Sequence, residues 1–176
     1  MPERTEGLIL VDIHDKAIGK ADKAEAHKAP LLHRAFSVFL TDGERLLLQR
    51  RAGGKYHAGG LWANACWSHP RAGEETVPSA ELRLQEELGM TCPLTEVGSF
   101  IYCHRFAEHL WEYEYDHVLL GRYNGDFKPD PAEIQELRWV TPAELGEELR
   151  SSPECFAPWF VTAAPIVLRC LAENGS

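Results

Sequence analysis

The stretch "SHPRAGEETVPSAELRLQEELGM", residues 68–90, predicts a loop that leads into a helix over residues 76–88. Pro78 falls in the first turn of this helix, where its missing N–H removes no intrahelical hydrogen bond. Gly89 follows the last turn and is a typical C-terminal stop. The stretch therefore predicts one helix with a defined beginning and end, preceded by a loop.

The predicted helix carries two carboxylates and a cation near its C-terminal end. Glu86 and Glu87 are adjacent, and Arg83 lies one turn before Glu87 on the same face. Adjacent carboxylates at a loop–helix junction can hold a magnesium ion that also contacts a diphosphate. Most glutamate pairs on helices form only a solvated acidic face, so this pattern by itself leaves both interpretations open.

The segments around this helix predict an α+β fold in which a mixed β-sheet lies between helices. Two apolar runs joined by a turn at Asp42 and Gly43 predict a hairpin over residues 34–51. Thr141 is the expected N-cap of a short helix, and a final helix is expected over residues 158–171. The other expected strands are residues 7–15, 61–67, 96–106, 111–123 and 136–140.

The composition predicts one globular domain over residues 1–176, with 44% hydrophobic residues. No apolar run approaches the roughly 18 residues that a membrane span needs. Five cysteines without a CxxC pair favour a reduced, cytoplasmic chain. The net charge of −9 argues against nucleic acid as a partner. Within this acidic chain, the segment "QRRAGGK" at residues 49–55 is a local basic cluster.

The spacing within residues 68–90 resembles the signature of the Nudix family. That signature runs Gly, five residues, Glu, seven residues, then Arg-Glu-apolar-x-Glu-Glu-x-Gly-apolar. The positions here are Ser68, Glu74, Leu82, Arg83, Leu84, Glu86, Glu87, Gly89 and Met90. Ser68 departs from glycine, Leu82 from arginine, and Arg83 from the first glutamate of the helix. Because the family's hydrolases need that glutamate to complete a metal cluster, the resemblance implies the Nudix fold but argues against pyrophosphate hydrolysis.

The altered signature resembles one branch of that family, type I isopentenyl-diphosphate isomerase. Other segments resemble the same branch in the same order along residues 5 to 165. These segments are "EAHKAPLLHRAFSVFL" (25–40), "QRRAGGKYHAGGLW" (49–62), "GLWANACWSHP" (60–70), "WEYEYDHVLLG" (111–121) and "FAPWF" (156–160). The resemblance implies a metal-dependent enzyme that acts on a prenyl diphosphate and is a monomer or homodimer.

The resemblance also implies a metal site of imidazoles and carboxylates. The implied ligands are His27, His33, His69, Glu112 and Glu114, with Glu87 as a further metal-binding carboxylate. This donor set suits Mn²⁺, Zn²⁺ or Mg²⁺, and Mg²⁺ is expected with the substrate diphosphate. Two residues that are two apart on a strand point to the same face, so both strand glutamates can reach one ion. The remaining histidines are interpreted as surface or hydrogen-bonded residues: His14, His57, His104, His109 and His117.

Four cations are expected to bind the diphosphate: Lys23, Arg51, Lys55 and Arg83. Charge-assisted hydrogen bonds to phosphate belong to the strong class of hydrogen bonds. Such a basic pocket would explain why an acidic chain carries a local basic cluster. Arg50 is instead expected to be a solvent-exposed cation.

The implied reaction moves a double bond in a five-carbon diphosphate, by adding a proton to one alkene carbon and removing another from its neighbour. In the family, a metal-bound glutamate (here Glu114), helped by a tyrosine (here Tyr102), serves as one acid/base group. The second is a cysteine two residues before the ligand His69, and Trp67 stands at that position. An indole N–H only donates and does not titrate in the useful range. Cys66 is expected to face the opposite side of its strand.

Three readings of this departure stay open. In the preferred interpretation, the protein isomerises its substrate through another proton carrier, such as Ser68, Tyr102, a bound water, or Cys66 through a bulge. Alternatively, Glu114 protonates a longer prenyl diphosphate and drives cyclisation or rearrangement, while Trp67 and Trp159 offer aromatic faces to the carbocation. The third reading is a non-catalytic prenyl diphosphate binder.

Overall fold

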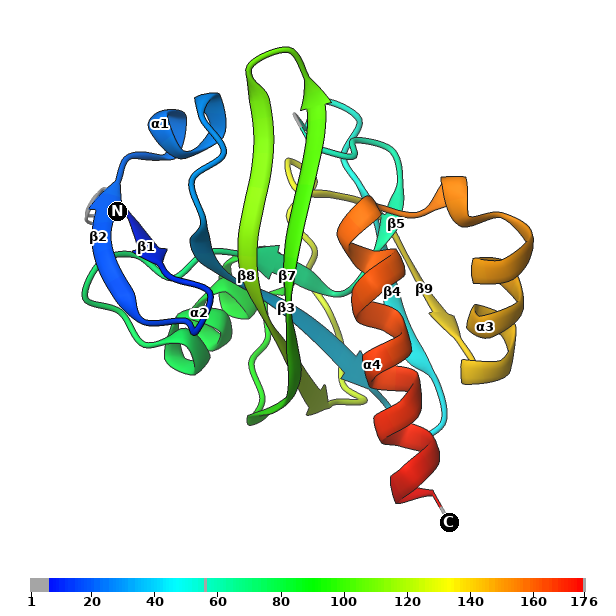
Figure 1. Ribbon diagram of the computed structural model, residues 1–176. Coiled ribbons are helices and arrows are strands. Elements are labelled where there is room, and N and C mark those ends of the chain that lie inside the picture. Colours follow the sequence, from blue (N-terminus) through cyan, green and yellow to red (C-terminus); the bar gives the residue numbers. More distant parts are fainter. Residues whose placement is uncertain (1–6, 56, 176) are drawn as a thin grey trace.

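A computed structural model describes residues 7–55 and 57–175 of the chain. Nine strands and four α-helices lie in the order β1 (Leu8–Val11), β2 (Ala17–Ala21), α1 (Lys23–Lys28), β3 (His33–Thr41), β4 (Leu46–Arg51), β5 (Trp62–Ala63), β6 (Cys66–Ser68), α2 (Thr76–Leu88), β7 (Leu94–Ala107), β8 (Leu110–Arg122), β9 (Ile134–Val140), α3 (Pro142–Ser151) and α4 (Pro158–Asn174) among these residues. A short 3₁₀ turn, Pro153–Cys155, connects the last two helices. Figure 1 shows the arrangement.

The strands form one mixed sheet that is centred on β3. One path through the sheet runs β2-β1-β3-β4-β5, while β6 and β8 also pair with β3, β9 with β4, and β7 with β8. The β3–β8 pairing is parallel over nine residue pairs, from His33↔Glu114 to Thr41↔Arg122, and the other pairings are antiparallel. The α+β class with a mixed sheet is therefore confirmed.

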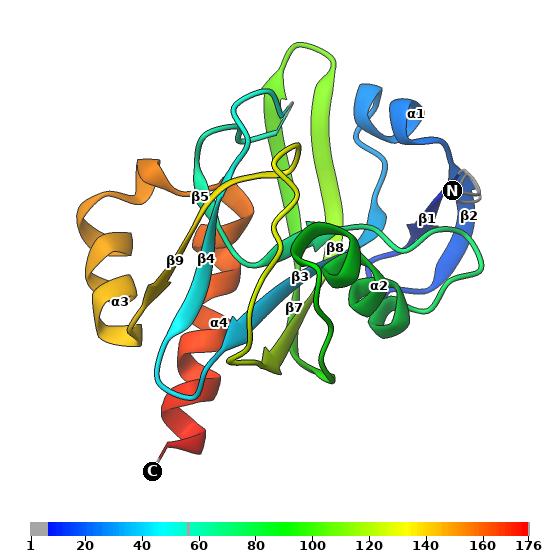
Figure 2. The same ribbon diagram turned by 180° about the vertical axis from the view of Figure 1, so that it is seen from behind.

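Helices cover the two sides of this sheet (Figures 1 and 2). On one side, α2 packs on a core cluster that includes Phe36, Val38 and Leu84. On the other side, α4 packs on a cluster that includes Phe39 and Phe160. Neighbouring residues of β3 thus enter different clusters. Because both faces of β3 are covered, the strand reads as a nearly continuous apolar run.

Several predicted elements have their expected bounds. The helix α2 covers residues 76–88, and Gly89 follows it with a φ of 67°, the left-handed conformation that glycine adopts without strain. Thr141 caps α3 in a capping box with Glu144. The helix α4 continues three residues past its predicted end at residue 171, to Asn174. Within the described ranges, none of the helices is long and apolar enough to pass through a membrane.

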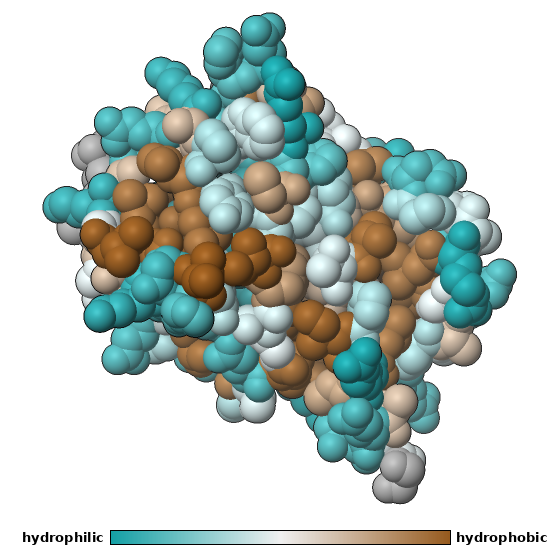
Figure 3. Space-filling model, viewed as in Figure 1, coloured by the Kyte–Doolittle hydropathy of each residue, from teal (hydrophilic) through white to brown (hydrophobic). Residues whose placement is uncertain are grey.

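The N-terminal strand differs from its prediction over residues 7–15. It ends at Val11, and β2 follows it as the second strand of a hairpin. Four of the five β2 residues are exposed, and Ile18 is 66% exposed. An alternation of apolar and polar residues therefore did not predict this strand. Hydrophobic residues are visible on the side of the molecule where this hairpin lies (Figure 3).

The expectation of one strand over residues 61–67 is wrong, because β5 and β6 are separate strands interrupted at Asn64. The buried Asn64 amide donates from Nδ2 to the carbonyls of Val38 (3.1 Å) and Cys66 (2.6 Å). Its Oδ1 accepts a hydrogen bond from Nε1 of Trp159 at 3.0 Å. The interruption allows β5 to pair with β4 and β6 to pair with β3.

The long β7–β8 hairpin positions the residues of the candidate site. The helix α1 lies on one side of it, and the loop between β4 and β5 lies on the other (Figures 1 and 2). The sequence interpretation did not predict α1, which is only six residues long and is fixed by a capping box between Asp22 and Glu25.

Candidate active site

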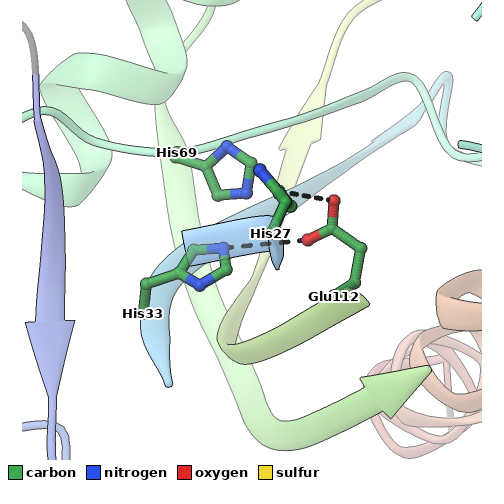
Figure 4. A group of neighbouring side chains, drawn as sticks. All are labelled: His27, His33, His69 and Glu112. Atoms are coloured by element: carbon green, nitrogen blue, oxygen red, sulfur yellow. Dashed lines mark ion pairs between the residues drawn. The ribbon is translucent and has the colours of Figure 1, made fainter. Parts of the chain in front are cut away.

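Five predicted metal ligands converge from four segments of the chain. His27 lies in α1, His33 begins β3, His69 directly follows β6, and Glu112 and Glu114 lie on β8. The ligand atoms of the three histidines and Glu112 lie within 4.8 Å of one another (Figure 4). The five side chains are named the His/Glu cage below. All five are buried.

Short distances connect imidazoles and carboxylates within the cage. Nε2 of His27 lies 2.8 Å from Oε1 of Glu112. Nε2 of His33 lies 3.7 Å from Oε2 of Glu112 and 3.6 Å from Oε2 of Glu114. Nε2 of His69 lies 2.5 Å from Oε2 of Glu114. His33 therefore lies near both glutamates, whereas His27 lies near Glu112 and His69 lies near Glu114.

The protonation pattern of the cage fits a divalent cation. Nδ1 of His27 contacts the carbonyl of Lys23, and Nδ1 of His33 contacts the carbonyl of Leu31 at 2.8 Å. Donation of Nδ1–H to a carbonyl leaves Nε2 with a free lone pair that faces the cage. The buried Nε2 atoms of His27 and His33, Oε2 of Glu112 and Oε1 of Glu114 have no hydrogen-bond partner. A metal ion bound by these atoms would satisfy them.

The titration of the cage residues follows from their burial and their neighbours. Burial lowers the pKa of His33 and of His69, which favours the neutral imidazole that binds metals. Burial and the nearby Glu112 and Asp116 raise the pKa of Glu114 well above its ordinary range. Burial also raises the pKa of Glu112, but the close approach of His27 and His57, with nitrogens 2.8 Å and 2.9 Å from Oε1, outweighs it and lowers that pKa overall.

A cavity of about 380 Å³ lies beside the cage and is lined by all four predicted diphosphate-binding cations, Lys23, Arg51, Lys55 and Arg83. His69 of the cage also lines it, so the two regions are continuous. Burial lowers the pKa of Lys23 and of Arg51. Such a group of partly buried cations around one cavity favours an anionic ligand.

Two carboxylates, Glu87 and Glu133, form ion pairs with two of these cations. Nη2 of Arg83 lies 2.9 Å from Oε1 of Glu87 and 3.3 Å from Oε1 of Glu133, and Lys55 also pairs with Glu133. Burial raises the pKa of Glu87. Glu87 lines the cavity as a predicted metal-binding carboxylate, but its place is outside the His/Glu cage. The sequence interpretation missed Glu133.

Trp67 and Cys66 lie on opposite sides of their strand. Trp67 lines the cavity, and its indole is stacked on Trp159. Cys66 is fully buried in the core cluster under α2, where burial and the nearby Glu87 raise its pKa well above the ordinary value. This arrangement agrees with the expected alternation along the strand.

Tyr102 lies on β7 directly opposite Glu114 of β8 in the strand register. Its hydroxyl is buried and has no hydrogen-bond partner. Burial, followed by the charges of Glu114 and Glu112, raises the pKa of Tyr102. The phenol is therefore a neutral donor beside the cage.

His57, interpreted from the sequence as an ordinary histidine, belongs to this region. Its Nδ1 lies 2.9 Å from Oε1 of Glu112, and its side chain lines the cavity. No local pattern signalled this position, although it lies within the glycine-rich segment that carries Lys55. His117, in contrast, contacts Asp15 at 2.8 Å and Glu96, away from the cage, in agreement with its ordinary interpretation.

Comparisons with known proteins support a single family. The model of the NUDIX domain matches residues 31–160. Isopentenyl-diphosphate Delta-isomerase 2 of Aromatoleum aromaticum is 44% identical over 96% of this chain and 90% of its own length. Isopentenyl-diphosphate Delta-isomerase of Nocardia farcinica is 46% identical over 94% of this chain and 96% of its own length.

Solved structures resemble the fold at low sequence identity. DR0079 from Deinococcus radiodurans has a TM-score of 0.75 and 19% identity, covering 91% of this chain and 98% of its own. The MutT protein from Methanosarcina mazei has a TM-score of 0.62 and 16% identity, covering 82% and 96%. These two likenesses concern the fold alone, whereas the matched domain and the sequence relatives show that the chain belongs to the isopentenyl-diphosphate Delta-isomerase family of NUDIX-domain proteins.

Proposed function

We propose that this protein catalyses the metal-dependent interconversion of isopentenyl diphosphate and dimethylallyl diphosphate. The observation that carries the proposal is the continuity of the buried His/Glu cage with a cavity lined by four cations. The relatives named as isopentenyl-diphosphate Delta-isomerases support the same substrate. The cations suit the diphosphate end of such a substrate, and the cage suits the proton chemistry at its alkene end.

The diphosphate end of the substrate is assigned to the cation-lined cavity. Arg51, Lys55, Arg83 and Lys23 would donate charge-assisted hydrogen bonds to its oxygens. Glu87 would bind the Mg²⁺ that accompanies a diphosphate. Because Arg83 already pairs with Glu87 and Glu133, the substrate would compete with these carboxylates for the guanidinium.

The His/Glu cage would hold a second divalent ion, Mn²⁺, Zn²⁺ or Mg²⁺, through His27, His33, His69, Glu112 and Glu114. Such an ion supplies positive charge that keeps the two glutamates in a fixed arrangement. The proton chemistry is assigned to side chains of the chain itself. Glu114 would deliver a proton to one alkene carbon, with Tyr102 beside it as a neutral hydrogen-bond donor.

Loss of a proton from the neighbouring carbon completes the isomerisation and restores a neutral alkene. Trp67 lines the cavity and would stabilise the intermediate carbocation through its aromatic ring, by about 0.5–2 kcal/mol. The predicted role of Trp159 as a second aromatic face is not supported, because its side chain is fully buried and does not line the cavity. Of the groups considered as second proton carrier, Ser68 lines the cavity, whereas Cys66 lies in the core under α2. We therefore favour Ser68 or a bound water over Cys66, and Tyr102 is assigned to the Glu114 side of the reaction.

Incubation with isopentenyl diphosphate in heavy water tests the proposal. Dimethylallyl diphosphate that contains deuterium is the expected product, formed slowly because Trp67 offers no titratable proton. Glu114→Gln is the matched control and should abolish exchange while keeping the shape of the side chain. A protein that leaves isopentenyl diphosphate unchanged but converts longer prenyl diphosphates to cyclic products, detected by mass spectrometry, would overturn isomerisation in favour of a cyclase.

A further inference from the structure

His57 joins the His/Glu cage to the cavity. It lies in the loop between β4 and β5 and is 8% exposed. Its ring centroid is 5.2 Å from that of His27 in the cage and 6.0 Å from that of Trp67 on the cavity wall. Phe106 of β7 packs on the same ring at 4.8 Å. Aromatic neighbours on several sides therefore fix the orientation of this imidazole.

The two ring nitrogens of His57 have different surroundings. Nδ1 lies 2.9 Å from Oε1 of Glu112. Nε2 is buried and has no hydrogen-bond partner. His27 and His33 show the opposite arrangement, because each directs Nδ1 to a backbone carbonyl and Nε2 to the carboxylates.

These differences distinguish a metal ligand from a residue that orients one. An imidazole that directs Nδ1 at a carboxylate oxygen is arranged to donate its N–H to that oxygen. Glu112 contributes to the cage, so a donor on Oε1 restricts the orientation in which the carboxylate meets an ion. With Nδ1 protonated, Nε2 is an acceptor and gives no hydrogen bond to a diphosphate oxygen.

We propose that His57 is a positioning residue of the metal site, which holds the Glu112 carboxylate by an Nδ1–H donor. The inference rests on the proposed function, because it requires a divalent ion in the His/Glu cage. Residues that orient metal ligands in this manner commonly change metal affinity about 10–100-fold when they are replaced. His57 therefore controls how tightly the cage binds its ion and has little influence on diphosphate binding.

Three substitutions of His57 distinguish the positioning role from a metal ligand and from a hydrogen-bond donor to the diphosphate. The amide nitrogen of His57→Asn occupies the place of Nδ1, whereas that of His57→Gln occupies the place of Nε2. Mn²⁺ affinity of the full-length protein, measured by competition titration, should fall about 10–100-fold in His57→Ala and His57→Gln. His57→Asn should restore it to within a few-fold of the unmodified protein. The KM for isopentenyl diphosphate should change little at saturating Mn²⁺.

The controls make each outcome decisive. His117→Ala removes another histidine that contacts carboxylates, on β8 but away from the cage, and should leave Mn²⁺ affinity unchanged. Electron spin-echo spectra of bound Mn²⁺ should show three imidazole ligands with and without His57. Unchanged affinity in His57→Ala, no restoration by His57→Asn, or the loss of a fourth imidazole signal in His57→Ala would overturn the positioning role. If the unmodified protein bound no Mn²⁺ at all, the metal site of the proposed function would fail, and the role of His57 with it.

Discussion

The indole rings of Trp67 and Trp159 are stacked, with their centroids 3.9 Å apart and 16° between their planes. The guanidinium of Arg51 lies over both rings, 5.3 Å and 5.1 Å from their centroids. Nε1 of Trp159 donates to the buried Asn64, which fixes the pair to the β5–β6 segment. The cavity wall beside the cage is therefore a packed aromatic surface. Trp67 forms part of this wall, and the sequence resemblance predicts a proton carrier at its position.

Trp67→Cys is expected to increase isomerase activity. A thiol at this position would face the cavity and could exchange a proton with the substrate, a contribution that is commonly about 10²–10⁴-fold. Removal of the indole also loosens the wall against Trp159, which would reduce this gain. We therefore expect kcat to rise by at least about tenfold, below the full contribution of a proton carrier. Product formation from isopentenyl diphosphate measures the effect. Trp67→Ala opens the same space without a thiol, and equal activity of the two variants would refute a proton-transfer role at this position.

Arg83→Gln is expected to raise the KM for the diphosphate substrate about 10–100-fold. A hydrogen bond to a charged group contributes about 1.5–3 kcal/mol, and its loss would also leave Glu87 and Glu133 without their shared cation. Steady-state kinetics at fixed ionic strength measure the change. Arg50→Gln is the matched control, because Arg50 donates to the carbonyl of Gly60 and does not line the cavity. A similar KM in both variants would contradict the assignment.

Removal of metal is expected to lower the stability of the protein. Elemental analysis should find about one divalent ion per chain at the cage, and His33→Ala should release it. An ion at 100 times its Kd stabilises the folded state by about 2.7 kcal/mol, so the melting temperature should fall in chelator. His117→Ala should retain the ion. Neither bound metal nor a chelator effect, even after metal supplementation, would argue against the cage as a metal site.

Local sequence patterns predicted the elements whose cause is local. The helix α2 has its own stop at Gly89, and the β8 strand follows from an alternating segment, in which residues 111–116 are aromatic and acidic in turn. The helix α1 also had a local signal, the capping box of Asp22 and Glu25, that the sequence interpretation did not use. The break at Asn64, in contrast, depends on hydrogen bonds to Val38 and Trp159, which are distant in sequence.

The candidate site shows the same division. The residues that converge in the cage were predicted because the resemblance compared whole segments, and the shared face of Glu112 and Glu114 also follows from strand alternation. His57 could not be identified in this way. Its contact joins the β4–β5 loop to β8, and only the packing of these segments around the long hairpin brings the two side chains together. No periodicity within the loop encodes that distance.

Asp116 is expected to make the stability of the metal-free protein depend on pH. It is a third buried carboxylate on the β8 face of Glu112 and Glu114, and Oγ of Ser37 donates to its Oδ2 at 2.8 Å. Burial raises the pKa of Asp116 to about 8, from an ordinary value of 3.8. The folded state therefore holds a proton that the unfolded state releases between these two values. As a result, the contribution of Asp116 to the free energy of unfolding is complete below about 3.8 and declines as pH rises towards about 8.

Asp116→Asn keeps the shape of the side chain but has no carboxyl proton to lose. Its free energy of unfolding should decline less than that of the unmodified protein as pH rises, so the difference between the two should be largest above pH of about 8. Urea unfolding in chelator from acidic to alkaline pH measures both curves. Asp126→Asn replaces an exposed carboxylate and should run parallel to the unmodified protein. If Asp116→Asn also ran parallel, then Asp116 would not take up a proton on folding, because a group with equal proton affinity in both states adds no slope.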